Sequence, residues 1–434
     1  MGADVDRRQL LAAAAGLATV PSLTRAQAVR PRITVISQWS AGSDGAAITK
    51  LGEAFTAAGG TWEHNPVPGF TTEMMNKLRA DILAGNPPAA SQLKGPEIAA
   101  WSRIAPTVDL NAVVAEAGYE QVVAPDLARL HKPQGRWIAL PLQIYRTNTL
   151  YASKKAMERV GATALPKTWA EYNALATKMK EAGITPVANG GQRPDDGQKF
   201  ETALVGIDPA AYRRAIMELD DRTLRGPQVL AAFRQLRMMS EWMDPAASGQ
   251  HYSTFLPRFI RGEMGLLIQG GWAQGVIRHA GFSDDDYLIG QAPVDNGTPA
   301  FLLNADAFIF WRRREPDFQA GQMLMANLVM SKRVQEMYSQ TTGSIPVRTD
   351  MDLSGAGWSA GQRETAASLA ASVRANQSLL SLAHNMAQPN AMTAAMIDVI
   401  TEFVHNKSVR PEQAVTRLAD AVEAVDHRRV PERA

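Results

Sequence analysis

The sequence predicts an α/β protein of two lobes, each a central, mainly parallel sheet flanked by helices. Its 434 residues exceed what one hydrophobic core usually supports, so two domains are the first expectation. Short β-branched segments also alternate with helical ones: strands are expected at 33–37, 62–67 and 90–94, and helices at 46–58 and 71–84. This alternation indicates a parallel sheet, which binds ligands beyond the carboxyl ends of its strands.

The rest of the chain is predicted to be richer in helices. Two extended segments, at 137–142 and 145–151, follow each other closely and are expected to cross into the second lobe. Thr168 and Glu171 have the spacing of a capping box before a helix. Further strands are expected at 185–188, 264–268, 287–292 and 307–311, a loop at 293–305, helical segments within 198–261 and at 316–330, 332–340, 360–376, 391–405 and 412–425, and a disordered tail at 428–434.

Composition indicates a globular protein with an ordinary surface. Hydrophobic residues make up 45% and charged residues 20%, and the net charge is +2 with no basic block, so neither nucleic acid nor an anionic membrane is an expected partner. The chain has no cysteine, which excludes disulfides, thiolate metal sites and the acylated cysteine of a lipoprotein.

Residues 1–28 have the pattern of a signal peptide. Arg7 and Arg8 precede an apolar stretch at 10–20, and Ala26 and Ala28 supply a small-x-small cleavage site. The paired arginines resemble a twin-arginine signal, with a Sec signal as the alternative. The apolar stretch is too short to span a bilayer. We therefore expect an exported, soluble, periplasmic protein.

A Gly-Gly-Trp sequence follows the expected strand at 264–268. Gly270 and Gly271 allow backbone angles that are closed to other residues, and we expect them to form a tight corner that presents Trp272 at the strand end. The alternative for Trp272 is an ordinary place in the core.

Motifs for catalysis are weak. Residues 357–361 fit the G-x-S-x-G pattern, but no strand is expected before them, so Ser359 is interpreted as a helix N-cap. The seven histidines show no metal-binding spacing, and no nucleotide-binding pattern is present. A carboxylate pair for glycoside hydrolysis remains an alternative, with Asp44 and Asp306 as the candidates.

The residues at the turns after strands favour a carbohydrate site. Trp39 and Trp272 could flank a pyranose, whose axial C–H groups pack on an indole face while its hydroxyls need polar partners. Carboxylates accept from hydroxyls, an ammonium donates, and an imidazole can do either. The residues predicted for these polar roles are Asp44, Lys94, Asp306 and His384.

The chain also resembles family 1 of the extracellular solute-binding proteins, the carbohydrate receptors of ABC importers, and within it the glucose/mannose-type periplasmic receptors. The features that carry the resemblance are Gln38-Trp39-Ser40 with Asp44, residues 85–88 and 92–96, 137–141, 168–172, 189–192, Gly262 to Gly265 with Gly271-Trp272, residues 304–308 and 343–348. They run in order through nearly the whole chain after the signal peptide.

The resemblance implies ligand contacts at Trp39, Asp44, Lys94, Trp272, Asp306 and His384. This chain departs from the subgroup at three positions. Gln38 stands where the subgroup has a second tryptophan, Asp44 where it has a longer carboxylate, and Thr342 where it has a lysine. One stacking surface and one cationic donor are therefore replaced, so Gln38, Ser40 and Thr342 are the positions expected to set specificity, since an unpaired buried hydroxyl costs about 1–3 kcal/mol.

By the same resemblance the fold is a type II periplasmic-binding-protein fold with the ligand cleft at the hinge. We expect 29–141 and 294–330 in the N-lobe, and 142–293 and 331–434 in the C-lobe. The resemblance implies a monomeric binding protein that uses no cofactor and catalyses no reaction. It would capture a monosaccharide or small oligosaccharide and deliver it to an ABC permease. The alternatives are a sugar sensor for a chemoreceptor or kinase, and a secreted carbohydrate-active enzyme.

Overall fold

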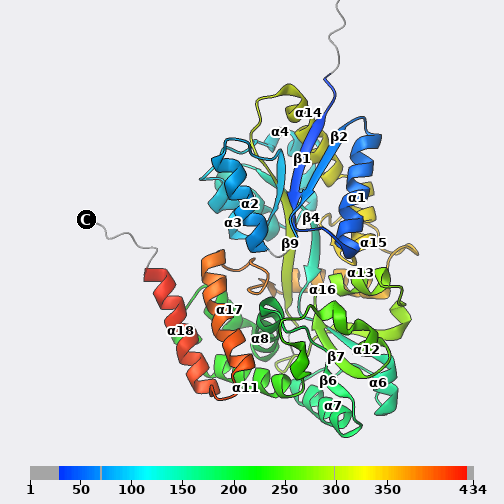
Figure 1. Cartoon of the computed structure of the whole chain (residues 1–434), viewed down its shortest axis with the longest axis vertical. Coiled ribbons are helices and arrows are strands. Elements are labelled where there is room, and N and C mark those ends of the chain that lie inside the picture. The colour runs from blue at the N-terminus through cyan, green and yellow to red at the C-terminus, as the bar shows by residue number, and fades with distance from the viewer. Residues whose placement is uncertain (1–28, 69–70, 298, 428–434) are drawn as a thin grey trace, which may run out of the picture.

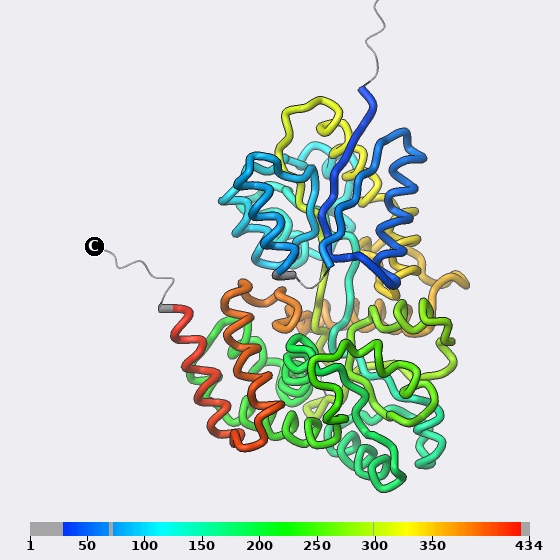
Figure 2. The backbone as a smooth tube through the Cα atoms, in the orientation of Figure 1, coloured from blue at the N-terminus to red at the C-terminus, as the bar shows by residue number. Residues whose placement is uncertain are grey.

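The computed structural model describes residues 29–427 except 69, 70 and 298. The expected signal peptide at 1–28 and the expected disordered tail at 428–434 lie outside the described residues. The chain forms two lobes, one above the other in Figure 1, and the backbone passes between them more than once, as Figure 2 shows. Among the described residues the first lobe contains a seven-stranded sheet and the second a four-stranded sheet.

The sheet of the first lobe has the strand order β10-β4-β9-β3-β1-β2, with β11 paired to β9. The strands β3 and β9 at its centre are buried on both faces, and each carries polar side chains within an otherwise apolar segment. Its elements are β1 (Arg32–Ser37), α1 (Gly42–Ala57), β2 (Thr61–Pro66), α2 (Thr71–Leu83), β3 (Ala90–Leu93), α3 (Pro96–Trp101), α4 (Asn111–Glu116), α5 (Pro125–His131), β4 (Ala139–Arg146), β9 (Phe301–Phe310), α14 (Pro316–Met330), α15 (Lys332–Thr342), β10 (Ile345–Pro346) and β11 (Ser378–Leu380).

The sheet of the second lobe has the order β6-β7-β5-β8 and is surrounded by helices. Its elements are β5 (Thr149–Ser153), α6 (Lys154–Arg159), α7 (Trp169–Glu181), β6 (Thr185–Val187), α8 (Arg193–Ile207), α9 (Pro209–Tyr212), α10 (Asp221–Leu224), α11 (Pro227–Glu241), α12 (Leu256–Ile260), β7 (Met264–Gln269), α13 (Trp272–His279), β8 (Tyr287–Gln291), α17 (Asn390–His405) and α18 (Pro411–His427). Helix α16 (Ala360–Arg374) contacts strands of both sheets.

Both sheets are mixed, which corrects the expectation of mainly parallel sheets. Strand β1 runs parallel to β2 and β3, but β9 runs antiparallel to β3 and β4. In the second sheet β5 runs antiparallel to both β7 and β8. The reason is that β4 carries the chain out of the first lobe and β9 brings it back, so these neighbouring strands run in opposite directions.

Strand β9 also corrects the expected loop at 293–305. It begins at Phe301, where residues 301–303 pair with β11 and residues 303–309 pair with β4. Both partners are distant in sequence, so nothing local to the segment indicates this pairing. Asp306 therefore lies inside a strand and not just before one.

Helix α15 lies in the first lobe, although the sequence placed residues after 330 in the second lobe. Helix α15 packs against α1, and its side chains Val334 and Tyr338 belong to the core of the first lobe. The chain thus stays in the first lobe through α15 and β10 and then continues to α16 between the lobes.

The two expected helix caps have different outcomes. Ser359 Oγ accepts from the backbone N–H of Gln362 at 3.0 Å, and the Gln362 side chain accepts from the Ser359 N–H at 3.2 Å, so Ser359 is confirmed as an N-cap. Thr168 likewise accepts from Glu171 N–H at 3.2 Å. The Glu171 carboxylate, however, accepts from the N–H of Lys167 at 2.7 Å, so only half of that capping box forms.

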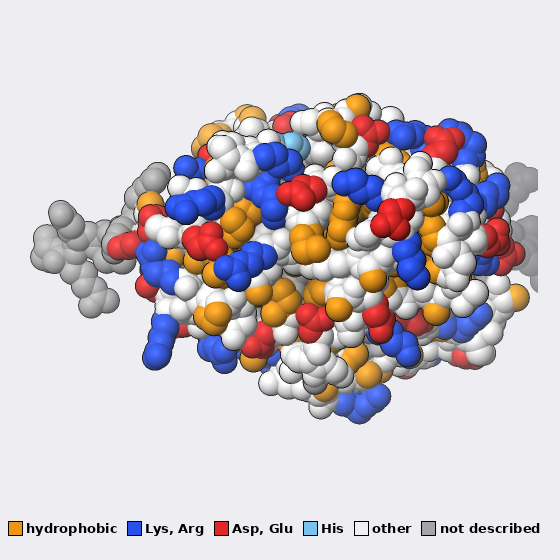
Figure 3. Space-filling model, turned by 90° about the horizontal axis from the view of Figure 1, so that it is seen from below, with side chains coloured by type: hydrophobic (Ala, Val, Ile, Leu, Met, Phe, Trp, Pro, Cys, Tyr) orange, Lys and Arg blue, Asp and Glu red, His pale blue; other side chains and the backbone are white. Residues whose placement is uncertain are grey.

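The lower face of the second lobe has no single dominant charge. On the lower face of the second lobe, Lys and Arg side chains are interspersed with Asp and Glu, as Figure 3 shows. None of the helices in the described part of the chain has the length and apolar character needed to cross a membrane.

Candidate functional site

A charged pair lies at the carboxyl end of β3. Lys94 directly follows this strand, and its Nζ lies 3.5 Å from Asp306 Oδ1 on the neighbouring β9. The same oxygen accepts from Gln92 Nε2 at 2.9 Å. The side chains of Lys94 and Asp306 are only 11% and 6% exposed, so their charges interact with little screening by water. Two residues predicted from sequence are thus brought together.

Asp44 belongs to the same cluster but lies in a helix. The sequence predicted a turn up to residue 45, whereas α1 begins at Gly42 and Asp44 occupies its first turn, where a carboxylate is favoured by the helix dipole. The pKa of Asp44 is raised to about 7, chiefly by burial and then by the negative charge of Asp306, while the Tyr145 hydroxyl and Lys94 act in the opposite direction. The Tyr145 hydroxyl lies 3.4 Å from Asp44 Oδ1.

A β-bulge places two further polar residues beside this cluster. The β4–β9 register shifts between Pro141 and Gln143, so Gln143 and not residue 142 lies opposite Asp306. The Gln143 side-chain oxygen accepts from the Tyr145 hydroxyl at 3.1 Å. Among the described residues the buried Gln143 Nε2 has no hydrogen-bond partner. The bulge therefore turns an amide and a phenol toward the face that carries Asp306.

Trp272 and His384 come from the second lobe and lie against each other. Their ring centroids are 4.8 Å apart, and Trp272 also packs edge-on to Tyr145 at 5.3 Å. Trp272 is partly exposed, so it is not simply a core residue. Its contact with Tyr145 joins the aromatic pair of the second lobe to the polar cluster of the first.

The two glycines before Trp272 are needed because they lack a side chain, and not because of their backbone angles. Neither Gly270 nor Gly271 has a positive φ, which corrects the sequence interpretation. A Cβ at Gly270 would lie 2.2 Å from the Trp272 ring, and one at Gly271 would lie 3.3 Å from the Tyr145 ring. The absence of side chains lets the indole fold back over the end of β7.

Trp39 lies in the core of the first lobe. It is 4% exposed and packs against Phe308 and Tyr338, with ring centroids 5.7 and 5.8 Å away. Tyr338 in turn lies within the electrostatic influence of Asp44. Trp39 therefore packs beneath the cluster of Asp44, Lys94 and Asp306. Among the described residues its ring makes no contact with the ring of Trp272.

The three expected specificity positions lie in different environments. Thr342 is fully buried, and its Oγ1 contacts Tyr338 O, Gln143 Oε1 and Ser344 Oγ at 3.0, 3.1 and 2.9 Å. Gln38 lines a small hollow that also contains Lys94. Ser40 is exposed and lines a larger open hollow beside the start of α1. The side chain of Thr342 is therefore shielded from solvent, whereas Gln38 and Ser40 each line a hollow.

Sequence reasoning missed Gln92, Gln143 and Tyr145. The segment 145–151 was expected to be extended, but its register against β9 depends on the bulge, which no local pattern announces. Among the described residues, no group of three His, Asp or Glu side chains could hold a metal ion.

Comparison with known proteins places this architecture in a family. The family model for bacterial extracellular solute-binding proteins matches residues 50–365. A probable sugar-binding periplasmic protein of Rhizobium meliloti (strain 1021) is 32% identical, covering 96% of this chain and 99% of the relative. A second one, of Brucella suis biovar 1 (strain 1330), is 31% identical, covering 95% and 97%. The chain therefore belongs to the bacterial extracellular solute-binding proteins.

Solved structures show the same fold. A chitin oligosaccharide binding protein superposes with a TM-score of 0.76 at 19% identity, covering 91% of this chain and 99% of that chain. A bacterial solute receptor, AcbH, described as having an exclusive preference for b-D-galactopyranose, superposes with a TM-score of 0.75 at 18% identity, covering 92% and 99%. The first of these structures is named as a binding protein, and the two sequence relatives are named as sugar-binding periplasmic proteins.

Proposed function

We propose that this protein is the periplasmic receptor of an ABC importer and binds a sugar between its lobes. The observation that carries the proposal is the convergence of an acidic and basic cluster from the first lobe with an aromatic pair from the second. The cluster is Asp44, Lys94 and Asp306, and the pair is Trp272 and His384. The names of the sequence relatives support a sugar as the ligand.

The chemistry of the cluster fits a polyhydroxylated ring. The carboxylates of Asp44 and Asp306 accept from ligand hydroxyls, and Lys94 donates to a ligand oxygen. Gln143 Nε2 is a buried donor with no partner among the described residues, so we assign it to a ligand oxygen as well. The partly exposed face of Trp272 packs against the C–H groups of the ring. The assignment thus uses both the predicted residues and one that only the structure reveals.

The lobes close on each other in this conformation. Helix α13 of the second lobe packs against α1 and α15 of the first, and a Cβ at Gly275 would lie 2.3 Å from Thr342 O and 2.9 Å from Ser43 Oγ. Because a ligand shifts an equilibrium only by its differential affinity, a sugar held by both lobes favours the closed form. In our proposal this form, as a monomer, docks on the membrane permease.

A sugar panel tests the proposal. Thermal-shift measurements with monosaccharides, disaccharides and polyols should reveal at least one ligand that raises Tm, and calorimetry should then give its affinity. Trp272→Ala should weaken that affinity at least about thirtyfold, because truncating a central tryptophan typically costs 2 kcal/mol or more. Ile104→Ala, which removes an exposed side chain that lines neither hollow, is the control and should bind as the wild type does. The proposal fails if no carbohydrate raises Tm.

A further inference from the structure

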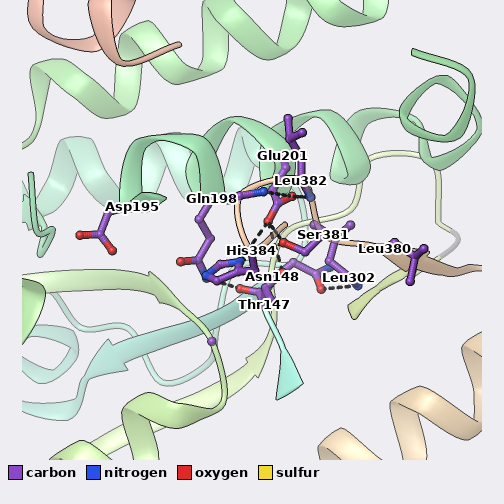
Figure 4. A network of polar contacts seen from close by, with 12 residues as sticks. Thr147, Asn148, Asp195, Gln198, Glu201, Leu302, Leu380, Ser381, Leu382 and His384 are labelled. Carbon is purple, nitrogen blue, oxygen red and sulfur yellow. Dashed lines mark hydrogen bonds and ion pairs between the residues drawn. The ribbon is translucent and has the colours of Figure 1, made fainter. Parts of the chain in front are cut away.

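A buried carboxylate lies beneath the segment that carries His384. Glu201 on α8 is fully buried and accepts from the backbone N–H groups of Leu382 and Ala383 at 2.6 and 3.2 Å through Oε2. Its Oε1 accepts from the Ser381 hydroxyl at 2.7 Å. Figure 4 shows these contacts converging from the 381–384 segment onto one side chain. Glu201 thus holds the segment by several hydrogen bonds, although no pattern in the sequence marks it.

The hydrogen bonds of Ser381 determine the proton position on His384. The Ser381 hydroxyl has a single proton. It donates this proton in its hydrogen bond to the Glu201 carboxylate, which can only accept and also accepts from backbone N–H groups. His384 Nδ1 lies 2.9 Å from the same Ser381 oxygen. Because the oxygen has no proton left to give, the Nδ1–H of His384 must be the donor in this contact.

The neutral imidazole carries only one ring proton, so Nε2 is left with a lone pair. Among the described residues, Nε2 of His384 forms no hydrogen bond, and the ring lies against the partly exposed Trp272. We infer that Glu201, through Ser381, fixes the Nδ1–H tautomer of His384, so that the receptor presents an acceptor at Nε2 to a sugar hydroxyl. The ligand part of this inference rests on the proposed function. Glu201 and Ser381 act as positioning residues and touch no ligand.

The same carboxylate also reaches the first crossing between the lobes. The hydroxyl of Thr147, directly after β4, lies 3.4 Å from Glu201 Oε1, and Gln198 Nε2 donates to Thr147 O at 2.6 Å. Helix α8 therefore holds both the crossing and the His384 segment, as Figure 4 shows. A purely structural role for Glu201 would predict lower stability on substitution but no change in the tautomer of a correctly folded variant.

Glu201→Gln distinguishes a structural role from control of the His384 tautomer, because glutamine has nearly the same side-chain shape as glutamate. The two backbone N–H groups can only donate, so the amide oxygen takes the Oε2 position and the NH₂ group takes the Oε1 position. This NH₂ donates to the Ser381 oxygen, which frees the Ser381 hydroxyl to donate to His384 Nδ1. The ring proton then moves to Nε2, and an acceptor at the ligand face becomes a donor.

Nitrogen-15 NMR of the imidazole rings at pH 8 measures the tautomer directly. His384→Phe identifies the signal among the seven histidines. In the wild type we expect a protonated Nδ1 and an unprotonated Nε2, and in Glu201→Gln the reverse. Tyr212→Phe is the matched control: it removes a hydroxyl that lies 3.1 Å from Glu201 Oε2 and also contacts Leu380 O and the Leu382 N–H, but leaves the Ser381 hydroxyl bond in place, so it should retain the wild-type tautomer. A protonated Nε2 in the wild type overturns the inference, whether or not Glu201→Gln folds.

Calorimetry with the best sugar of the panel tests the ligand part. Glu201→Gln should bind roughly tenfold to a hundredfold more weakly, because a ligand hydroxyl then faces a donor in place of an acceptor. Tyr212→Phe should bind within about twofold of the wild type. Unchanged affinity with a reversed tautomer refutes the acceptor role while leaving the proposed function intact. If no sugar binds to the wild type, the proposed function fails, and the ligand part of this inference fails with it.

Discussion

Asp44→Asn should stabilise the ligand-free protein at alkaline pH while weakening sugar binding. Folding raises the pKa of Asp44 from its usual 3.8 to about 7, chiefly because burial disfavours the charged carboxylate. A raised pKa means that the group's contribution to stability is fully present below pH 3.8 and is lost as the pH rises through 7. At about 1.36 kcal/mol per pKa unit, the cost of the ionised carboxylate at pH 8 has an upper limit of about 4 kcal/mol.

The measured gain should be smaller, about 1–3 kcal/mol at pH 8, because Asp44 is partly exposed and opening of the lobes hydrates it. Urea unfolding of the variant and the wild type at pH 5 and pH 8 measures the difference, which should shrink by more than half at pH 5. Asp285→Asn, which removes an exposed carboxylate, is the control and should show no such pH dependence.

Binding provides the second half of the test. A neutral amide accepts a ligand hydroxyl less strongly than a carboxylate, so Asp44→Asn should lose about tenfold to a hundredfold in sugar affinity. Wild-type affinity should also fall below about pH 7 as Asp44 is protonated, whereas the affinity of the variant should not. The reasoning is refuted if the variant is less stable than the wild type at pH 8.

Two further substitutions probe the closure of the lobes and the presentation of the indole. Glu97→Gln should weaken sugar binding about two- to fivefold in calorimetry, since Glu97 of the first lobe accepts at 3.0 Å from the first backbone N–H of α17 in the second, and its charge favours that helix N-terminus. Trp101→Phe, which removes part of a buried ring and its bond to Glu97 within the first lobe but leaves the contact between the lobes in place, is its control and should bind normally. Gly270→Ala should displace the ring of Trp272 and weaken binding at least tenfold, because its Cβ would lie 2.2 Å from that ring. Gly355→Ala has open space around the new Cβ and should bind as the wild type does; equal affinities in the two variants would argue against this role of Gly270.

The sequence by itself determined most of the local structure and the family. The helices expected at 316–330, 360–376, 391–405 and 412–425 correspond within two residues at each end to α14, α16, α17 and α18, because their periodicity and caps are local properties. Lys94 could be proposed from the sequence because it follows a short strand and precedes a helix, and the structure places it beside Asp306. The family relationship was likewise readable from motifs in order along the chain.

Only the tertiary structure decided how these residues meet. The bulge in β4 depends on pairing with a strand more than 150 residues later, and it decides that Gln143 and Tyr145 share a face with Asp306. The burial of Trp39 depends on Phe308 and Tyr338, which are even more remote in sequence. No local pattern distinguishes Glu201 from other helix residues, whereas in the folded protein five donors from other segments converge on it. Periodicity and caps act over a few residues, whereas register, burial and the satisfaction of a buried charge are set by partners that only folding brings together.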